Sequence, residues 1–177
     1  ITTQRATAVA MGADHKPVRP AISWLDQRTV ETKPELGAFE SALMTLVKAK
    51  SFVDMVHQQA EANWIAQEQP QVWQQVDKFL LLSGYQTLRL TGQYTDAVAS
   101  QVGYIPFDFK TLGWASKNDW KWRAVCITPE MLPELKPAGE ALGYISQAAA
   151  DESGIPAGLP LIASGSDKAC EVLGTGC

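Results

Sequence analysis

Apolar residues recur at helical spacing through the first half of this chain. Steps of three and four residues predict one helix over residues 34–50, with Leu36, Phe39, Leu43, Leu46 and Val47 on its buried face. A second helix is predicted over residues 52–67, with Val53, Val56, Ala60 and Trp64 along one face. A third begins at Pro70, and its stripe is formed by Val72, Trp73, Val76, Phe79 and Leu80.

Extended segments flank these helices. Residues 7–11 and 18–24 are separated by turn-forming residues and predict a β-hairpin. Residues 102–109 predict an edge or irregular strand, because Pro106 cannot donate to a strand ladder. Residues 159–163 are a short apolar run that suits an inner strand of a parallel sheet. Helices alternate with strands, so the fold class is α/β.

Shorter elements complete the pattern. A short helix is predicted from residue 128 and a longer one over residues 145–153, and Gly84 and Gly92 are expected to punctuate the middle of the chain. Residues 111–123 hold three of the six tryptophans and predict a loop or short helix on the surface. His15 is placed in a turn and His57 on a helix, both in structural roles.

Composition restricts the classes of function. A chain of 177 residues, 46% of them hydrophobic, can form one domain with a substantial core. The net charge of −4 and the scattered basic residues argue against nucleic acid as a partner. The apolar run at residues 79–82 is far shorter than the roughly 20 residues that cross a bilayer, so no membrane is expected. Three cysteines without metal-ligand spacing fit reduced thiols in the cytoplasm, and no metal site is predicted.

Asp167 is the candidate for chemistry. It follows the predicted strand at residues 159–163 and a tight exit at Gly165, and a helix is predicted from Lys168 to Leu173. In open α/β sheets ligands bind beyond the carboxyl ends of strands, and a helix N-terminus favours an ionised carboxylate. Such a group can accept a proton or bind a cation. On spacing alone, the helix N-cap is the more common role for an aspartate at such a position.

The segment that contains Asp167 resembles the signature of the FGGY carbohydrate kinases. The matching residues are Gly165, Ser166 and Asp167, followed by Leu173, Gly174, Thr175 and Gly176. Four more segments resemble the family in the same order. They are residues 21–28 with Trp24, Asp26 and Arg28; Leu90, Thr91, Gly92 and Asp96; Leu132, Pro133, Glu134 and Gly143; and residues 154–160.

This resemblance implies an actin-like (ribonuclease H-like) ATPase fold. Residues 1–177 would be the FGGY-like N-terminal, sugar-binding domain, incomplete because its first strands would precede Ile1. A C-terminal nucleotide-binding domain would follow Cys177 and is expected as a partner. The implied reaction is transfer of the γ-phosphoryl group of ATP to a hydroxyl of a sugar or polyol, with Mg²⁺ as cofactor. The residues that bind the nucleotide are not identified, and a homodimer is kept open.

In such a kinase, Asp167 would be the general base. The substrate would be bound by Gln4, Arg5, Ala6, Lys168 and Trp24. Ala6 departs from the family, in which glycerol kinases have an acidic residue and xylulokinases a histidine at the matching place. A pentulose such as xylulose or ribulose is the first expectation for the substrate, and a polyol the second.

Several alternatives stay open beside this interpretation. Asp26 and Arg28 could form an ion pair that braces the chain, rather than contribute to the sugar pocket. The domain could also be a non-catalytic sugar-binding or regulatory module of the same fold, since a fold alone does not fix function. With either function, the 177 residues alone are expected to transfer no phosphate.

Overall fold

The computed structural model describes residues 1–32, 34, 44–46, 49–102 and 104–176. Its helices are α2 (Lys50–Gln59), α3 (Glu61–Glu68), α4 (Pro70–Trp73), α5 (Leu82–Thr91), α6 (Lys121–Ala124), α7 (Gln147–Ser153) and α8 (Asp167–Gly174), with 3-10 turns η1 (Val98–Ser100) and η2 (Pro129–Met131). Its strands are β1 (Ala8–Met11), β2 (Lys78–Leu81), β3 (Thr95–Ala97), β4 (Phe107–Asp108), β5 (Gly113–Trp114), β6 (Glu134–Lys136), β7 (Ala141–Tyr144) and β8 (Pro160–Ile162). The helix predicted over residues 34–50 falls largely outside the described residues. No helix in the described ranges is long and apolar enough to span a bilayer.

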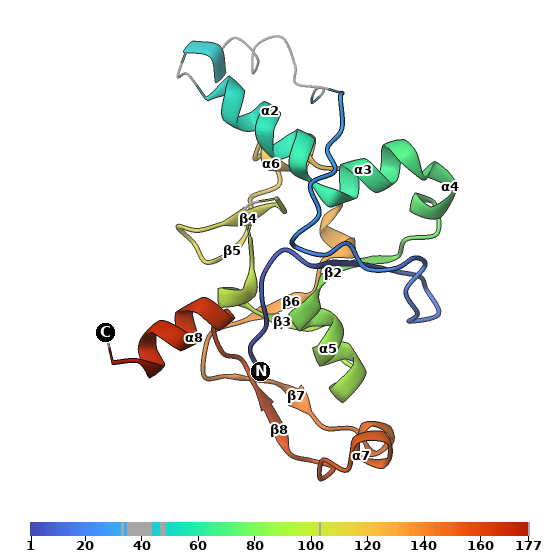
Figure 1. Cartoon of the computed structure of the whole chain (residues 1–177), viewed down its shortest axis with the longest axis vertical. Coiled ribbons are helices and arrows are strands. Elements are labelled where there is room, and N and C mark those ends of the chain that lie inside the picture. Colours follow the sequence, from blue (N-terminus) through green and yellow to red (C-terminus); the bar gives the residue numbers. More distant parts are fainter. Residues whose placement is uncertain (33, 35–43, 47–48, 103, 177) are drawn as a thin grey trace.

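The antiparallel pair β1 and β2 forms the centre of the core. Successive side chains of a strand point to opposite faces, and here both faces are covered. One face packs against α2 and α3. Its strand residues Ala8, Ala10, Phe79 and Leu81 belong to one cluster with Val53 and Val56 of α2 and Ile65 of α3. The other face packs against α5, where Val9, Met11 and Leu80 of the strands belong to one cluster with Leu88 of the helix. In Figure 1, α2, α3 and α4 gather at one end of the molecule, and β7, β8 and α7 at the other.

The helix predicted from Pro70 through Leu80 is wrong in its second half. Pro70 does begin a helix, but α4 ends at Trp73, and residues 78–81 form β2. Phe79 and Leu80 are almost fully buried on opposite faces of that strand. A run that is apolar on both faces shows no alternation, so its residues also matched a helical stripe. The following helix α5 was not predicted, and Gly84 lies inside it, while Gly92 caps it with a φ of 76°.

Two other predictions near the N-terminus need correction. The helix predicted over residues 52–67 is interrupted at Ala60, whose backbone is extended, so that it forms α2 and α3. The predicted hairpin has β1 as its first arm. Its second arm makes only isolated bridges, from Ala8 to Ile22 and from Met11 to Pro17. Trp24 begins a turn rather than continuing a strand, with the Asp26 amide donating to the Ser23 carbonyl at 2.9 Å.

The strand before Asp167 is also different from the prediction. Residues 160–162 form β8, but β8 pairs antiparallel with β7, and Pro160 and Ile162 are exposed. The apolar run indicated a strand correctly, yet it carries no information about which segment becomes the partner. Within the described residues, parallel pairing occurs instead between β3 and β6.

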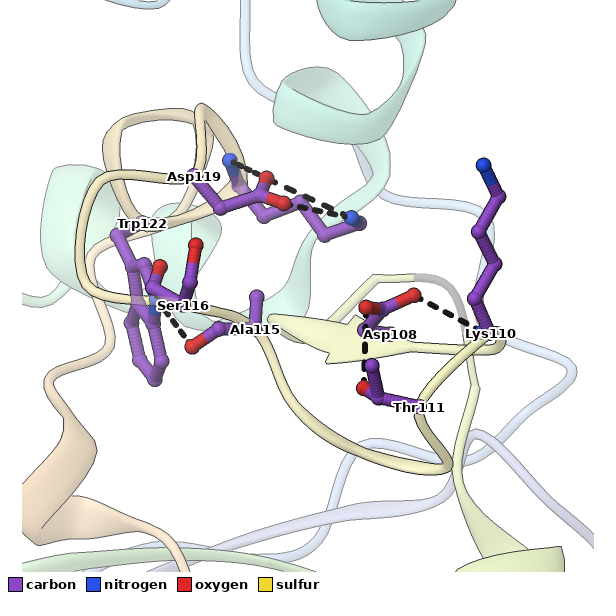
Figure 2. A network of polar contacts seen from close by, with 8 residues as sticks. Asp108, Lys110, Thr111, Ala115, Ser116, Asp119 and Trp122 are labelled. Carbon is purple, nitrogen blue, oxygen red and sulfur yellow. Dashed lines mark hydrogen bonds and ion pairs between the residues drawn. The ribbon is translucent and has the colours of Figure 1, made fainter.

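The tryptophan-rich segment lies between η1 and β6 and is held by short-range hydrogen bonds, as expected for a loop with a short helix. Figure 2 shows the two oxygens of Asp108 accepting from the Lys110 amide at 2.9 Å and from the Thr111 hydroxyl at 3.0 Å. The Trp122 indole donates to the carbonyls of Ala115 and Ser116 at 3.1 and 3.0 Å. Of the described residues in the range 102–109, the structure assigns only Phe107–Asp108 (β4) to a strand.

Candidate functional site

Asp167 is the first residue of α8. The preceding Ser166 is the N-cap residue by backbone geometry and makes no side-chain capping bond, so Asp167 is not the N-cap. The carboxylate is half-buried, and its Oδ1 accepts from the Lys168 amide at 2.7 Å.

The first three residues of the chain run beside this turn. The Ile1 amino group donates to the Ile162 carbonyl at 2.7 Å, and the Thr2 hydroxyl donates to the Gly165 carbonyl at 2.7 Å. The Asp167 amide donates to the Thr3 carbonyl at 3.2 Å. The predicted substrate segment, which begins at Gln4, therefore starts directly next to Asp167.

Thr7 connects this segment to Trp24. Its buried hydroxyl accepts from the Gln4 side-chain amide at 3.3 Å and from the Trp24 backbone amide at 3.2 Å. Trp24 keeps 56% of its surface exposed, and Ala6 adopts a left-handed φ of 64°. Thr7 had no role in the sequence interpretation. The only signal for Thr7 in the sequence was that it directly follows the predicted substrate residues Gln4, Arg5 and Ala6.

A polar hollow of about 360 Å³ lies beside these residues. This volume is at the lower end of the range for small-molecule sites, about 300–1,000 Å³. We call it the Trp24 hollow; its lining includes Ala6, Trp24, Asp26, Arg28, Gln59, Glu61 and Tyr104.

Two acids of the Trp24 hollow differ in their environment. Asp26 is paired, with its Oδ1 2.7 Å from Arg28 Nε, and hydrogen bonds from the Arg28 backbone and side chain lower the pKa of Asp26. The expected ion pair is therefore confirmed, and the Arg28 guanidinium also lies 4.3 Å from the centre of the Trp64 ring. Burial raises the pKa of Glu61 to about 7, and the nearby charge of Asp26 adds to this effect.

The remaining predicted site residues lie elsewhere. Arg5 lines a second, mainly apolar hollow of about 500 Å³ with Val98, Phe107, Phe109 and Leu112. The Lys168 ammonium lies 3.0 Å from Glu171 Oε2 on the exposed side of α8. The structure thus brings Gln4, Ala6 and Trp24 together, with Asp167 next to the start of their segment. Asp167 lines neither hollow.

The arrangement offers a proton acceptor and a polar hollow with an aromatic wall. Within the described parts of the chain, no three histidine, cysteine or carboxylate side chains converge as a metal site. We therefore derive no step through a metal ion from these residues.

A carboxylate at a strand-to-helix turn is typical of α/β proteins that bind small polar molecules. Residues 1–174 match the model of the FGGY family of carbohydrate kinases, N-terminal domain, and the chain belongs to this family. Among solved structures, it is similar to xylulose kinase from Rhodospirillum rubrum, with a TM-score of 0.76 and 20% identity over 99% of this chain and 36% of that one. The actin-like α/β fold expected from the sequence is confirmed.

Curated relatives are similar along nearly the whole chain. An uncharacterized sugar kinase of Escherichia coli (strain K12) is 30% identical over 172 residues, which cover 97% of this chain and 27% of that protein. Xylulose kinase of the same organism is 26% identical over 178 residues, covering 99% of this chain and 35% of that protein. The chain thus spans about a third or less of the length of these relatives.

Proposed function

We propose that the protein carrying this chain phosphorylates a hydroxyl of a sugar or polyol with ATP, and that this chain supplies the sugar-side domain and the base, Asp167. One observation carries the proposal. The half-buried carboxylate of Asp167 stands at the N-terminus of α8, and its backbone is hydrogen-bonded to the segment that leads into the Trp24 hollow. Membership of the carbohydrate kinase family supports the reaction class.

The chemistry requires little more than placement. A sugar hydroxyl is barely acidic, and phosphoryl transfer runs through a loose transition state that depends mainly on positioning and charge stabilisation. The hydroxyl oxygen forms a bond to the γ-phosphorus, the bond from that phosphorus to the β–γ bridging oxygen breaks, and ADP leaves. The hydroxyl proton passes to Asp167. Positioned general bases contribute about 10²–10⁴ in rate.

The non-reacting part of the sugar would lie toward the Trp24 hollow. Trp24 offers an apolar ring face for the carbon chain, and Gln4 and Ala6 border the same side. Arg5 and Lys168 remain part of the proposed substrate set, although the second hollow and Glu171 engage them in this structure. ATP, Mg²⁺ and a nucleotide-binding domain belong to the proposal for the whole protein. The 177 residues alone are then expected to transfer no phosphate.

A phosphorylation screen of the full-length protein tests the proposed function. ATP would be supplied with xylulose, ribulose, glycerol and other sugars and polyols, and ADP release would be measured. We expect a pentulose to be phosphorylated, with a polyol as the second candidate. A protein that binds a sugar of the panel without phosphorylating any of them would support the non-catalytic, sugar-binding alternative instead.

A further inference from the structure

Glu61 stands out in the Trp24 hollow because no described residue pairs with its carboxyl group. Asp26 has its counter-charge in Arg28, at 2.7 Å. Glu61 lines the same hollow, yet in the described part of the chain its side chain has no ion pair and no hydrogen bond to another residue. Glu61 is half-buried and lines the hollow, so its carboxyl oxygens are free to accept hydrogen bonds from a molecule bound there.

The charges of the hollow restrict that molecule. Burial raises the pKa of Glu61, and the repulsion from Asp26 acts in the same direction. Uncharged hydroxyl groups can donate hydrogen bonds to the carboxyl oxygens of Glu61 and, unlike an anionic group, meet no repulsion from Asp26. Arg28, the cation of the hollow, is already paired with Asp26.

The geometry relates this position to the proposed base. Thr3 accepts the hydrogen bond from the Asp167 amide, and Ala6, three residues later, lines the hollow. Three residues of extended chain span at most about 10–11 Å. The turn of Asp167 and the Trp24 hollow therefore lie along the same short segment of the chain.

We propose that Glu61 determines substrate selection by accepting a hydrogen bond from a hydroxyl at the end of the sugar remote from the phosphorylated one. This inference rests on the proposed function. It adds Glu61 to the substrate-binding residues and assigns the Trp24 hollow to the non-reacting end of an uncharged, hydroxyl-rich substrate.

Kinetics of the full-length protein test the role of Glu61. The substitution Glu61→Ala removes the acceptor, whereas Glu61→Gln keeps an oxygen that can accept. For xylulose or ribulose, we expect Glu61→Ala to raise KM by about fivefold to about 150-fold, the range that an unpaired buried polar group produces. We expect kcat to stay within about threefold of wild type. Glu61→Gln should restore most of the affinity, and glycerol, with fewer hydroxyls beyond the reacting end, should be affected least.

The control is Glu68→Gln, on the exposed end of the same helix α3, where the Glu68 carboxylate accepts from the Gln67 side chain. It should leave KM unchanged for every substrate. Thermal unfolding provides a second readout. Glu61 is the first residue of α3, and an acid that only complements the helix dipole would make Glu61→Gln less stable. A residue kept for binding should instead give an equal or higher Tm in Glu61→Gln, because the repulsion from Asp26 is removed.

The outcomes separate the two proposals. Wild-type phosphorylation of a pentulose with an unchanged KM in Glu61→Ala overturns the role of Glu61 and leaves the proposed function standing. Pentulose binding that needs Glu61, measured by quenching of tryptophan fluorescence, without any phosphorylation overturns the kinase proposal and retains the binding role. Absence of both binding and phosphorylation across the panel overturns both.

Discussion

Asp96 is a fully buried carboxylate in β3, where it connects two neighbouring elements. Its Oδ1 accepts from the Ala97 amide at 2.7 Å, and its Oδ2 accepts from the Gln101 side chain at 3.0 Å. A Cβ built on Gly84, in α5, would lie 3.2 Å from Oδ2, so glycine allows the helix to approach the acid closely. Burial raises the pKa of Asp96 to about 6 despite these hydrogen bonds.

This shift predicts how stability depends on pH. Between about pH 4 and pH 6 the folded state keeps a proton on Asp96 that the unfolded state has released, so stability falls as pH rises. A shift of about two units corresponds to about 3 kcal/mol across this window. In Asp96→Asn that contribution disappears, and the free energy of unfolding should fall less steeply between pH 4 and pH 6. Urea unfolding of both proteins at several pH values measures the two slopes, and equal slopes would contradict the raised pKa.

Residue-level predictions succeeded where a local pattern defined the position. Asp167 at the start of α8, the Asp26 to Arg28 pair and the turn at His15 were all readable from neighbouring residues. Glu61 and Thr7 were not readable. Their positions depend on segments far apart in sequence coming together, as in the hollow that Glu61 and Asp26 both line.

At the scale of elements, the contact between α5 and β7 shows how closely two segments can approach. A Cβ on Gly143, in β7, would lie 2.9 Å from Thr91 Cβ at the end of α5. Thr91 cannot rotate away freely, because its hydroxyl donates to the Thr87 carbonyl at 2.7 Å. The absence of a side chain at residue 143 therefore sets the distance between strand and helix.

Replacing Gly143 with alanine should separate these two elements. We expect Gly143→Ala to lower the free energy of unfolding by about 1–3 kcal/mol, as overpacking of a core does. Gly113→Ala is the matched control, because Gly113 also lies in a strand but has no atom within 4 Å of its would-be Cβ. The control should change stability by less than about 0.5 kcal/mol. Equal stabilities of the two variants in urea unfolding would show that α5 and β7 can separate at no cost.

The mispredicted elements are those whose structure is decided by segments distant in sequence. Residues 78–81 are covered on both faces, by α2 and α3 on one side and by α5 on the other, so their pattern could not distinguish a strand from a helix. For β8 the strand itself was predicted, but its antiparallel pairing with β7 is a non-local choice. The helix predicted over residues 145–153 is confirmed as α7, whereas for α5 only the glycine at its end, Gly92, was anticipated.

At the scale of the whole molecule, the site lies near the middle of the elongated view in Figure 1, where the N-terminus meets β8 and α8. The far end of α8 is exposed, with Val172 and Leu173 keeping 56% and 78% of their surface. The chain spans about a third or less of its carbohydrate kinase relatives. In our proposal, this chain holds the acceptor sugar and the base, and the rest of the protein presents ATP to them.

The substitution Asp167→Asn in the full-length protein tests this account most directly, because asparagine keeps the shape of the side chain but cannot take the proton. Steady-state turnover and sugar binding would be measured together, with Asp151→Asn, at an exposed aspartate of α7, as the matched control. The account predicts a fall in kcat of about 10²–10⁴ for Asp167→Asn, with sugar affinity within a few fold of wild type and a control that behaves as wild type. Near-normal turnover in Asp167→Asn would contradict the role of Asp167 as the base.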